Sequence, residues 1–172
     1  MGAIFLTAVG DMFGRTLSFQ RSVPGLLNSV TTPGGRVIRY QQLFTRNKKN
    51  LEGAAYPDGT LRRYHYENTK YTHALTGITD EKGIRYATWQ YDIKGRAISS
   101  IHHGNVDGYQ ISYDTDSTVV TDPLGTRRTY GFQTINGRVK NTAISQPAGA
   151  GCGAASSNIA YDGNGNVATR TD

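Results

Sequence analysis

The sequence predicts an all-β protein made of consecutive antiparallel hairpins, with almost no helix. Three observations lead to this prediction. The motif Asp-x-x-Gly, which is typical of tight turns, occurs five times in 172 residues. Short segments rich in Thr, Val, Ile and Tyr lie between the turns, as expected of β-strands. No window carries apolar residues at the spacing of an amphipathic helix.

The turn motif recurs along the whole chain. The aligned glycines Gly14, Gly35, Gly59 and Gly83 follow one another at nearly equal intervals. Their period lies in the range of roughly 20 to 50 residues that is typical of repeat proteins. We therefore predict a single array of about seven irregular units over residues 1–172. The residues assigned to the structural repeat motif are Asp11, Gly14, Phe19, Gly35, Tyr40, Gly59, Tyr64, Tyr66, Asp80, Gly83, Trp89, Tyr91, Asp92, Gly95, Arg96, Asp122, Gly125, Tyr130, Phe132, Tyr161, Asp162 and Gly165.

Aromatic residues follow the aligned glycines at a nearly fixed distance. In four units the first aromatic lies five residues after the glycine, as Tyr40 does after Gly35. Trp89 lies six residues after Gly83, which a β-bulge holding one extra residue would explain. Aromatics two residues apart share one face of a strand. We therefore expect an aromatic stripe that packs hairpins together, rather than a platform on which ligands stack.

The segments between the turns are assigned in chain order. The apolar run 3–9 is read as a strand, residues 43–52 are left open because they tolerate a helical turn, and residues 148–157 predict a glycine-rich loop within the array. Strands are expected at residues 15–20, 26–32, 36–42, 60–66, 84–91, 97–102, 109–113, 118–121, 126–132, 138–145, 158–161 and 166–171.

Positive charge is concentrated in residues 1–70. This part holds ten Lys or Arg and four acids, whereas residues 71–172 hold nine of each. The densest point comprises Arg46, Lys48 and Lys49, followed by Arg62 and Arg63. Such a cluster can attract phosphate or another acidic partner. We favour a solvated edge that discourages pairing between sheets, and we do not expect nucleic acid as a partner.

The single cysteine and the apolar start of the chain limit other classes of protein. Cys152 alone cannot form an internal disulfide or a four-cysteine metal site. The run 3–9 is too short for a signal peptide or a membrane span. We therefore expect no membrane span in this chain.

The polar residues do not form a recognisable catalytic or metal-binding pattern. His102 and His103 are adjacent on a predicted strand and would face opposite sides, and no carboxylate is placed to orient His65 or His73. Calcium-binding aspartate repeats have a nine-residue period, which this chain lacks, so we assign the aspartates to turns. We expect no catalytic residue, no metal and no cofactor, and hence no enzymatic activity.

Two segments resemble the signature of RHS repeats, which are also called YD repeats. They are Tyr91-Asp92-Ile93-Lys94-Gly95-Arg96 and Tyr161-Asp162-Gly163-Asn164-Gly165-Asn166. Residues 11–19 and 122–130 resemble the other half of that repeat, so the resemblance covers nearly the whole chain. It implies a curved strip of hairpins that is part of a β-shell, as in bacterial polymorphic toxins, insecticidal toxin complexes and teneurins.

In that family the shell encloses a toxic C-terminal domain or presents a cell-surface module. The resemblance therefore implies a non-enzymatic scaffold whose partners are neighbouring repeats or an encapsulated toxin. About seven units are fewer than a closed shell needs, and no toxin domain follows Asp172, so we expect a fragment of a larger protein. The whole protein is expected to be secreted or at the cell surface, and a stranded fragment would be cytoplasmic.

Two alternative functions follow from the residues themselves. A carbohydrate or cell-surface binding module would use exposed aromatics such as Trp89, Tyr109 and Tyr113. A basic element would contact nucleic acid or an acidic cargo through residues 1–70, with a steep dependence on salt.

Overall fold

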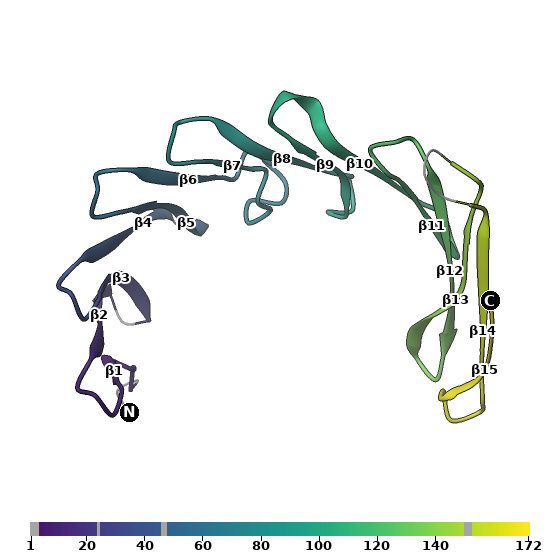
Figure 1. The fold of residues 1–172 in the computed structure, drawn as a ribbon, viewed down its shortest axis with the longest axis horizontal. Helices are drawn as coiled ribbons and strands as arrows, with labels where there is room; N and C mark the ends of the chain where they lie inside the picture. Colours follow the sequence, from purple (N-terminus) through teal and green to yellow (C-terminus); the bar gives the residue numbers. More distant parts are fainter. Residues whose placement is uncertain (1–3, 24, 46–47, 150–152) are drawn as a thin grey trace. The chain divides into compact units, whose positions relative to one another are not determined.

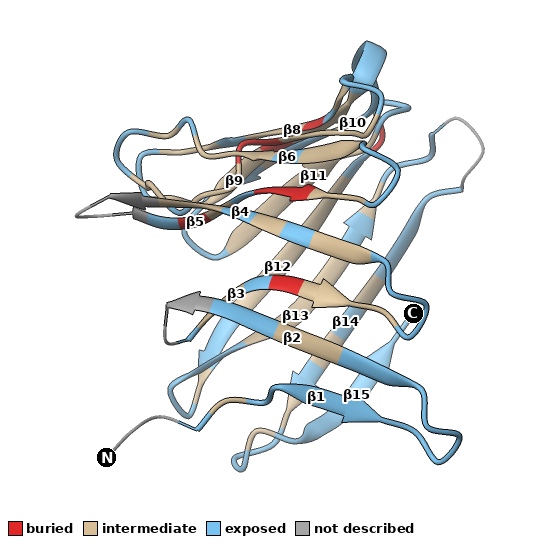
Figure 2. Ribbon diagram, turned by 90° about the vertical axis from the view of Figure 1, so that its left-hand side faces the viewer, coloured by how far each residue is buried: buried red, intermediate tan, exposed pale blue. Residues whose placement is uncertain are grey.

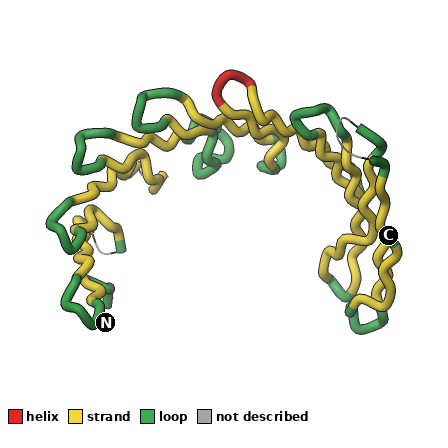
Figure 3. The backbone as a smooth tube through the Cα atoms, in the orientation of Figure 1, coloured by secondary structure: helices red, strands yellow, loops and turns green. Residues whose placement is uncertain are grey.

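The protein is a chain of antiparallel strands. The computed structural model describes residues 4–23, 25–45, 48–149 and 153–172. These residues form fifteen β-strands and one 3-10 turn, His103–Asn105, and the order of the strands in the sheet follows their order in the sequence (Figures 1 and 3). The predicted all-β strip of consecutive antiparallel strands with almost no helix is confirmed.

Contacts divide the chain into two units, Met1–Thr88 and Trp89–Asp172. The first unit contains β1 (Ala8–Gly10), β2 (Thr16–Val23), β3 (Leu26–Thr31), β4 (Val37–Thr45), β5 (Lys48–Ala55), β6 (Leu61–His65), β7 (Gly77–Thr79) and the start of β8 (Arg85–Tyr91). The second contains the end of β8, β9 (Ala97–His102), β10 (Val106–Tyr113), β11 (Ser117–Thr121), β12 (Arg127–Ile135), β13 (Arg138–Gln146), β14 (Ala155–Tyr161) and β15 (Val167–Thr171).

Most predicted strands are present, and the differences have local causes. The open segment 43–52 is not helical in its described part, because β4 and β5 form a hairpin there. β5 and β7 were not predicted, since β5 is rich in Lys, Gly and Ala and β7 has only three residues. The loop predicted at 148–157 ends earlier, because β14 begins at Ala155 and pairs with β13. The strand expected at 3–9 begins only at Ala8, because residues 4–7 are not part of β1. Residue 3 and Cys152 lie outside the described residues.

Pairing in the first unit separates an aromatic face from a polar face. Tyr40 lies opposite Ala54, and Tyr64 opposite Ile78, so each aromatic has a smaller residue beside it on the same face. Arg39 lies opposite Ala55, and Arg63 opposite Gly53, on the other face. Since residues directly opposite each other share a face, these registers give the strip two chemically different sides.

Small buried residues recur on the polar face with the repeat period. Ser29, Gly53 and Gly77 follow one another at equal intervals in the sequence, and all three are buried. Gln20 accepts a hydrogen bond from Ser29, and the side chain of Arg85 covers Gly77. A small residue on one strand therefore makes room for a long side chain from a neighbouring strand.

The described residues contain no apolar core of the usual kind. The buried hydrophobic residues are Ala54 and Ala87, and among the described residues no large side chain is fully buried. The buried residues are few and scattered, and most of them lie on the strands (Figure 2). A single sheet has no second layer to cover it, so most of its apolar side chains are only half-buried.

Candidate functional site

Every Asp-x-x-Gly segment forms the same tight turn. The aspartate N–H donates to the carbonyl of the fifth residue, and the glycine N–H donates back to the aspartate carbonyl at 2.9 to 3.1 Å. Seven aligned glycines have φ between 76° and 85°, a conformation that disfavours any residue with a Cβ. The turns beginning at Thr32 and Tyr56 share this backbone pattern without an aspartate in first position. The glycine is thus the constant element.

The aspartate side chain completes the turn. In all five motifs its Oδ1 accepts the N–H groups two and four residues later, at 2.8 to 3.0 Å. The Arg96 backbone N–H is the main cause that holds the pKa of Asp92 below its usual value. The Asn166 N–H does the same for the pKa of Asp162. Asp92 and Asp162 are therefore ionised acceptors inside their own turns.

Neighbouring side chains lock the turn motif in the second unit. Asp92 Oδ2 accepts from Arg96, whose guanidinium lies 4.1 Å from the Tyr113 ring centroid. The Tyr113 hydroxyl donates to the Ala97 carbonyl at 2.7 Å. Tyr113 is thus engaged in stabilising the hairpin after Asp92.

The aromatic motif residues are half-buried rather than displayed. This applies to Phe19, Tyr40, Tyr64, Tyr66, Trp89, Tyr91, Tyr130, Phe132 and Tyr161. Of the three aromatics considered for carbohydrate binding, Trp89 and Tyr113 are half-buried and only Tyr109 is exposed, at 42%. These three residues therefore do not form an exposed platform.

The irregular spacing after Gly83 has a structural counterpart. Ile78 pairs with Ala87 and Thr79 pairs with Arg85, so Tyr86 is one extra residue on β8. This confirms the predicted bulge. The bulge returns Ala87 and Trp89 to the register of the aromatic face.

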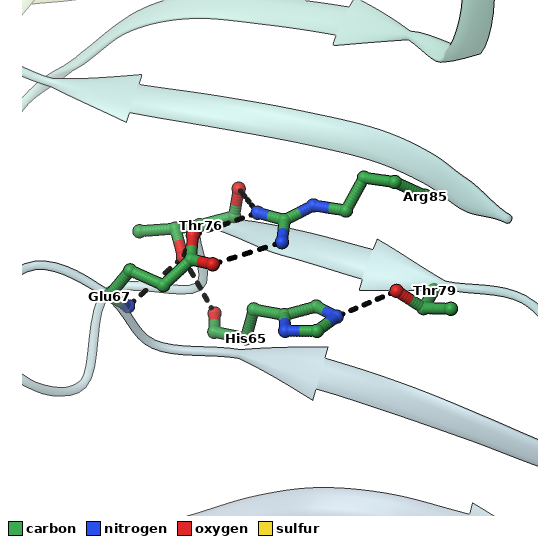
Figure 4. Close-up of polar contacts among 5 residues, drawn as sticks. All are labelled: His65, Glu67, Thr76, Thr79 and Arg85. Carbon is green, nitrogen blue, oxygen red and sulfur yellow. Dashed lines mark hydrogen bonds and ion pairs between the residues drawn. The ribbon is translucent and has the colours of Figure 1, made fainter. Parts of the chain in front are cut away.

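A polar cluster holds the long connection between β6 and β7 (Figure 4). Arg85 makes a two-pronged contact with Glu67 at 3.0 and 2.9 Å, and also donates to the Thr76 carbonyl at 3.0 Å. The Thr76 hydroxyl lies 2.8 Å from Glu67 and accepts the Glu67 N–H at 3.1 Å. His65 Nε2 lies 2.7 Å from the Thr79 hydroxyl. The cluster joins β6, β7, β8 and the connection.

The cluster is electrostatically matched. The hydrogen bonds from Arg85 and then Thr76 lower the pKa of Glu67 to about 2. Burial lowers the pKa of His65, and the charge of Arg85 lowers it further. At neutral pH the cluster therefore holds an ionised glutamate, a cationic arginine and a neutral imidazole, which is a structural arrangement rather than an acid–base pair.

The other histidines lie in separate environments. His73 Nδ1 contacts Asn50 Oδ1 at 2.6 Å, and Asn50 also donates to the Thr72 carbonyl. His103 lies in the 3-10 turn, so its predicted place on a strand is wrong; the chain turns at Gly104, which has φ of 75°. Among the described residues, no group of three or more His, Cys, Asp or Glu is gathered as a metal site.

The predicted basic cluster is divided between faces. Arg62 pairs with Ala54 and Arg63 with Gly53, which places the two arginines on opposite sides of the sheet. Arg62 binds Glu81 at 2.9 Å, so part of its charge is balanced. Arg46 lies outside the described residues. Alternation along β6 thus prevents the two arginines from acting as one patch.

Sequence reasoning missed the cluster around Glu67. Its members lie on three strands and one connection, and none belongs to a repeated motif. The one local signal was the departure from the turn pattern after Tyr66, where the segment 67–76 replaces a tight turn.

Comparison with known proteins gives a likeness of fold. No protein-family model and no curated protein sequence matches the chain. The TcdB2-TccC3-TEV crystal structure aligns with a TM-score of 0.61 and 18% identity, over 94% of this chain and 9% of that chain. The TcdB2-TccC3 crystal structure aligns over 87% of this chain and 10% of that chain, with 15% identity and a TM-score of 0.47.

The first alignment agrees with the Tyr-Asp motifs and with the observed hairpin strip. The chain spans less than a tenth of the length of the toxin-complex chain that it resembles. Within the described residues, no helix has the length and hydropathy needed to span a membrane. In fold, the described residues are therefore similar to a segment of this toxin-complex chain.

Proposed function

We propose that the chain is a non-enzymatic scaffold, one segment of a β-shell that encloses or presents a C-terminal toxin. The observation that carries the proposal is the single-layer sheet whose described residues bury only two hydrophobic side chains, Ala54 and Ala87. A compact domain of this length would bury a larger core. The wall of a shell needs no such core, because one face of the sheet borders the interior of the shell and the other face borders the exterior.

The polar residues support the same role. The motif aspartates accept hydrogen bonds within their own turns. The side chains of the Glu67 cluster hydrogen-bond one another and hold the connection between β6 and β7. These side chains maintain the backbone of the strip. The TcdB2-TccC3-TEV structure is named after two toxin-complex components, TcdB2 and TccC3. The likeness of fold to a chain of that structure therefore supports a toxin-associated role.

The proposal extends to location and partners. The strip would belong to a secreted or cell-surface bacterial protein, and its partners would be neighbouring repeats and the enclosed domain. Among the described residues, the outer edges of β1 and β15 pair with no strand. In the shell these edges would be covered by further strands.

An antibody against the purified chain tests this proposal in the source cells. Native extracts, medium and surface fractions are blotted, and the native protein is digested with protease before and after heating. We expect antigen well above the 18.8 kDa of this chain, outside the cytoplasm, with a protected domain that becomes digestible after heating. Antigen confined to the cytoplasm at the size of the chain, or no protected domain, would contradict the proposal.

A further inference from the structure

The tight turns of the first unit gather on one edge of the sheet. In an antiparallel array every second connection lies at the same edge. The connections β3–β4, β5–β6 and β7–β8 therefore share an edge (Figure 1). Their side chains border an open cleft of about 670 Å³, to which Arg36, Ile38, Tyr56, Pro57, Asp58 and Glu81 contribute.

A second cleft continues the first across the sheet. Its volume is about 400 Å³, and it is lined by Arg62, Ile78, Asp80, Glu81 and Tyr86. Glu81 lines both clefts, which makes them neighbours. The register places Ile38, Arg62 and Ile78 on the aromatic face. Successive turns thus form a groove that crosses the strands on that face.

The groove is lined by both apolar and polar residues. Ile38, Pro57 and the Tyr56 ring supply apolar surface, and Asp58 and Glu81 supply carboxylates. Burial raises the pKa of the Tyr56 hydroxyl, which therefore stays protonated as a donor. A mostly apolar cleft with a few placed polar groups is the usual form of a small-ligand site.

The charges of the groove favour a neutral ligand. Two arginines face three carboxylates, and Glu81 is paired with Arg62 at 2.9 Å. Asp58 accepts the hydroxyl of Thr60 at 2.7 Å, and Asp80 accepts two N–H groups of its turn. Each carboxylate keeps further acceptor sites, because an ionised carboxylate has about four. A strongly anionic ligand would meet the carboxylates, and a strongly cationic ligand would meet the arginines.

The strands beneath the groove also disfavour an extended peptide. β4, β5 and β6 pair with neighbours on both sides. Their backbone groups are therefore not free to accept an added strand, which is the common way for a sheet to bind a peptide.

The groove offers side chains that suit a sugar. The Tyr56 ring can pack against the C–H groups on one face of a sugar ring, and the carboxylates and guanidinium groups can hydrogen-bond sugar hydroxyls. We propose that the groove binds a neutral, linear oligosaccharide, with Tyr56 beneath a sugar ring and Asp58 and Glu81 accepting its hydroxyls.

Saturation-transfer NMR on the purified chain tests the site. The probes are cellohexaose, maltohexaose and chitohexaose, with a heparin-derived hexasaccharide as the anionic comparison. We expect binding of at least one neutral probe and a loss of affinity of about tenfold in Tyr56→Ala. Tyr109→Ala is the matched control, since it removes an exposed tyrosine from the second unit and should leave affinity unchanged.

Arg36→Ala is a second variant that carries little risk to folding. Arg36 is exposed, and its side chain has no hydrogen bond or ion pair with the described residues. We expect a loss of affinity of about threefold with an unchanged circular dichroism spectrum. The proposal is overturned if no neutral probe binds, if Tyr56→Ala and Arg36→Ala both retain wild-type affinity, if Tyr109→Ala abolishes binding, or if the heparin fragment binds more tightly. The shell proposal would survive each of these results.

Discussion

At the residue scale, Asp122 shows how one side chain can define a turn. Its Oδ1 accepts the N–H groups of Leu124 and Thr126, both at 2.9 Å, and its Oδ2 accepts from Arg128 at 3.0 Å. These hydrogen bonds outweigh the effect of burial and hold the pKa of Asp122 below its usual value. Three groups would therefore lose their acceptor if the carboxylate were removed.

We expect Asp122→Ala to lower the urea midpoint clearly, and Asp122→Asn to lower it less. Asparagine keeps an oxygen for the two backbone donors but loses the negative charge that Arg128 contacts. Asp116→Ala is the control, because the Asp116 side chain is exposed. The hydrogen bond that Asp116 accepts from the Phe132 N–H is made by its backbone carbonyl, which the substitution keeps. Equal midpoints for Asp122→Ala and Asp116→Ala would show that the side-chain hydrogen bonds do not stabilise the turn.

Glu67 provides a pH-dependent contribution to stability. Its pKa falls from the ordinary value of 4.5 to about 2 in the folded chain. A group whose pKa is depressed on folding stabilises the protein above its unfolded pKa and loses that contribution as the pH falls through the folded pKa. The relevant window is therefore between about pH 4.5 and pH 2.

We expect Glu67→Gln to reduce the free energy of unfolding at pH 6 by about 1 kcal/mol, a figure kept small because the Glu67 side chain is exposed to solvent. The difference from wild type should shrink as the pH falls toward 2. Urea unfolding at pH 6, 4 and 3 measures it. Glu52→Gln, which changes an exposed glutamate on β5, should not depart from wild type. A constant difference at all three pH values would mean that Arg85 does not hold the carboxylate.

At the scale of the element, the tight turn depends on one glycine conformation. Pro33-Gly34-Gly35 offers two glycines in one connection, which makes a matched test possible. Gly35 has φ of 76°, whereas Gly34 lies outside the left-handed region. A Cβ added at either glycine would have nothing within 4 Å. The two positions therefore differ in backbone conformation and not in available space.

Gly35→Ala should therefore reduce the free energy of unfolding by about 1 to 2 kcal/mol, the cost of a left-handed residue with a Cβ. Gly34→Ala should be neutral or stabilise by a few tenths of a kcal/mol, since alanine restricts the unfolded chain. Urea unfolding of both variants measures the difference. If both variants lose the same stability, the positive φ is not what makes Gly35 necessary.

At the scale of the whole molecule, the lack of a buried core in the described residues affects thermal unfolding. The change in heat capacity on unfolding scales with the apolar surface that becomes exposed. We expect a value per residue below the usual ~12 to 15 cal/mol/K, measured by differential scanning calorimetry. Light scattering on the same sample establishes whether the chain is monomeric. A usual or larger value in a monomer would contradict the single-layer structure of the described residues.

The sequence by itself determined the repeat, the turn positions and the all-β class. These features are local: Asp122 and Gly125 specify a turn within four residues, and the displaced Trp89 indicated the bulge at Tyr86. Local patterns also explain where prediction failed, because Lys, Gly and Ala in β5 and the three residues of β7 have little strand propensity of their own. Both become strands by pairing with neighbours on each side.

Only the tertiary structure decided which side chains meet. Glu67 and Arg85 are eighteen residues apart, and the groove joins three turns that alternate with other connections. Their contacts depend on the register of several consecutive strand pairs. A sequence period specifies the repeat, but the register between strands places Ile38, Arg62 and Ile78 on one face, because a shift of one residue turns every side chain to the opposite side.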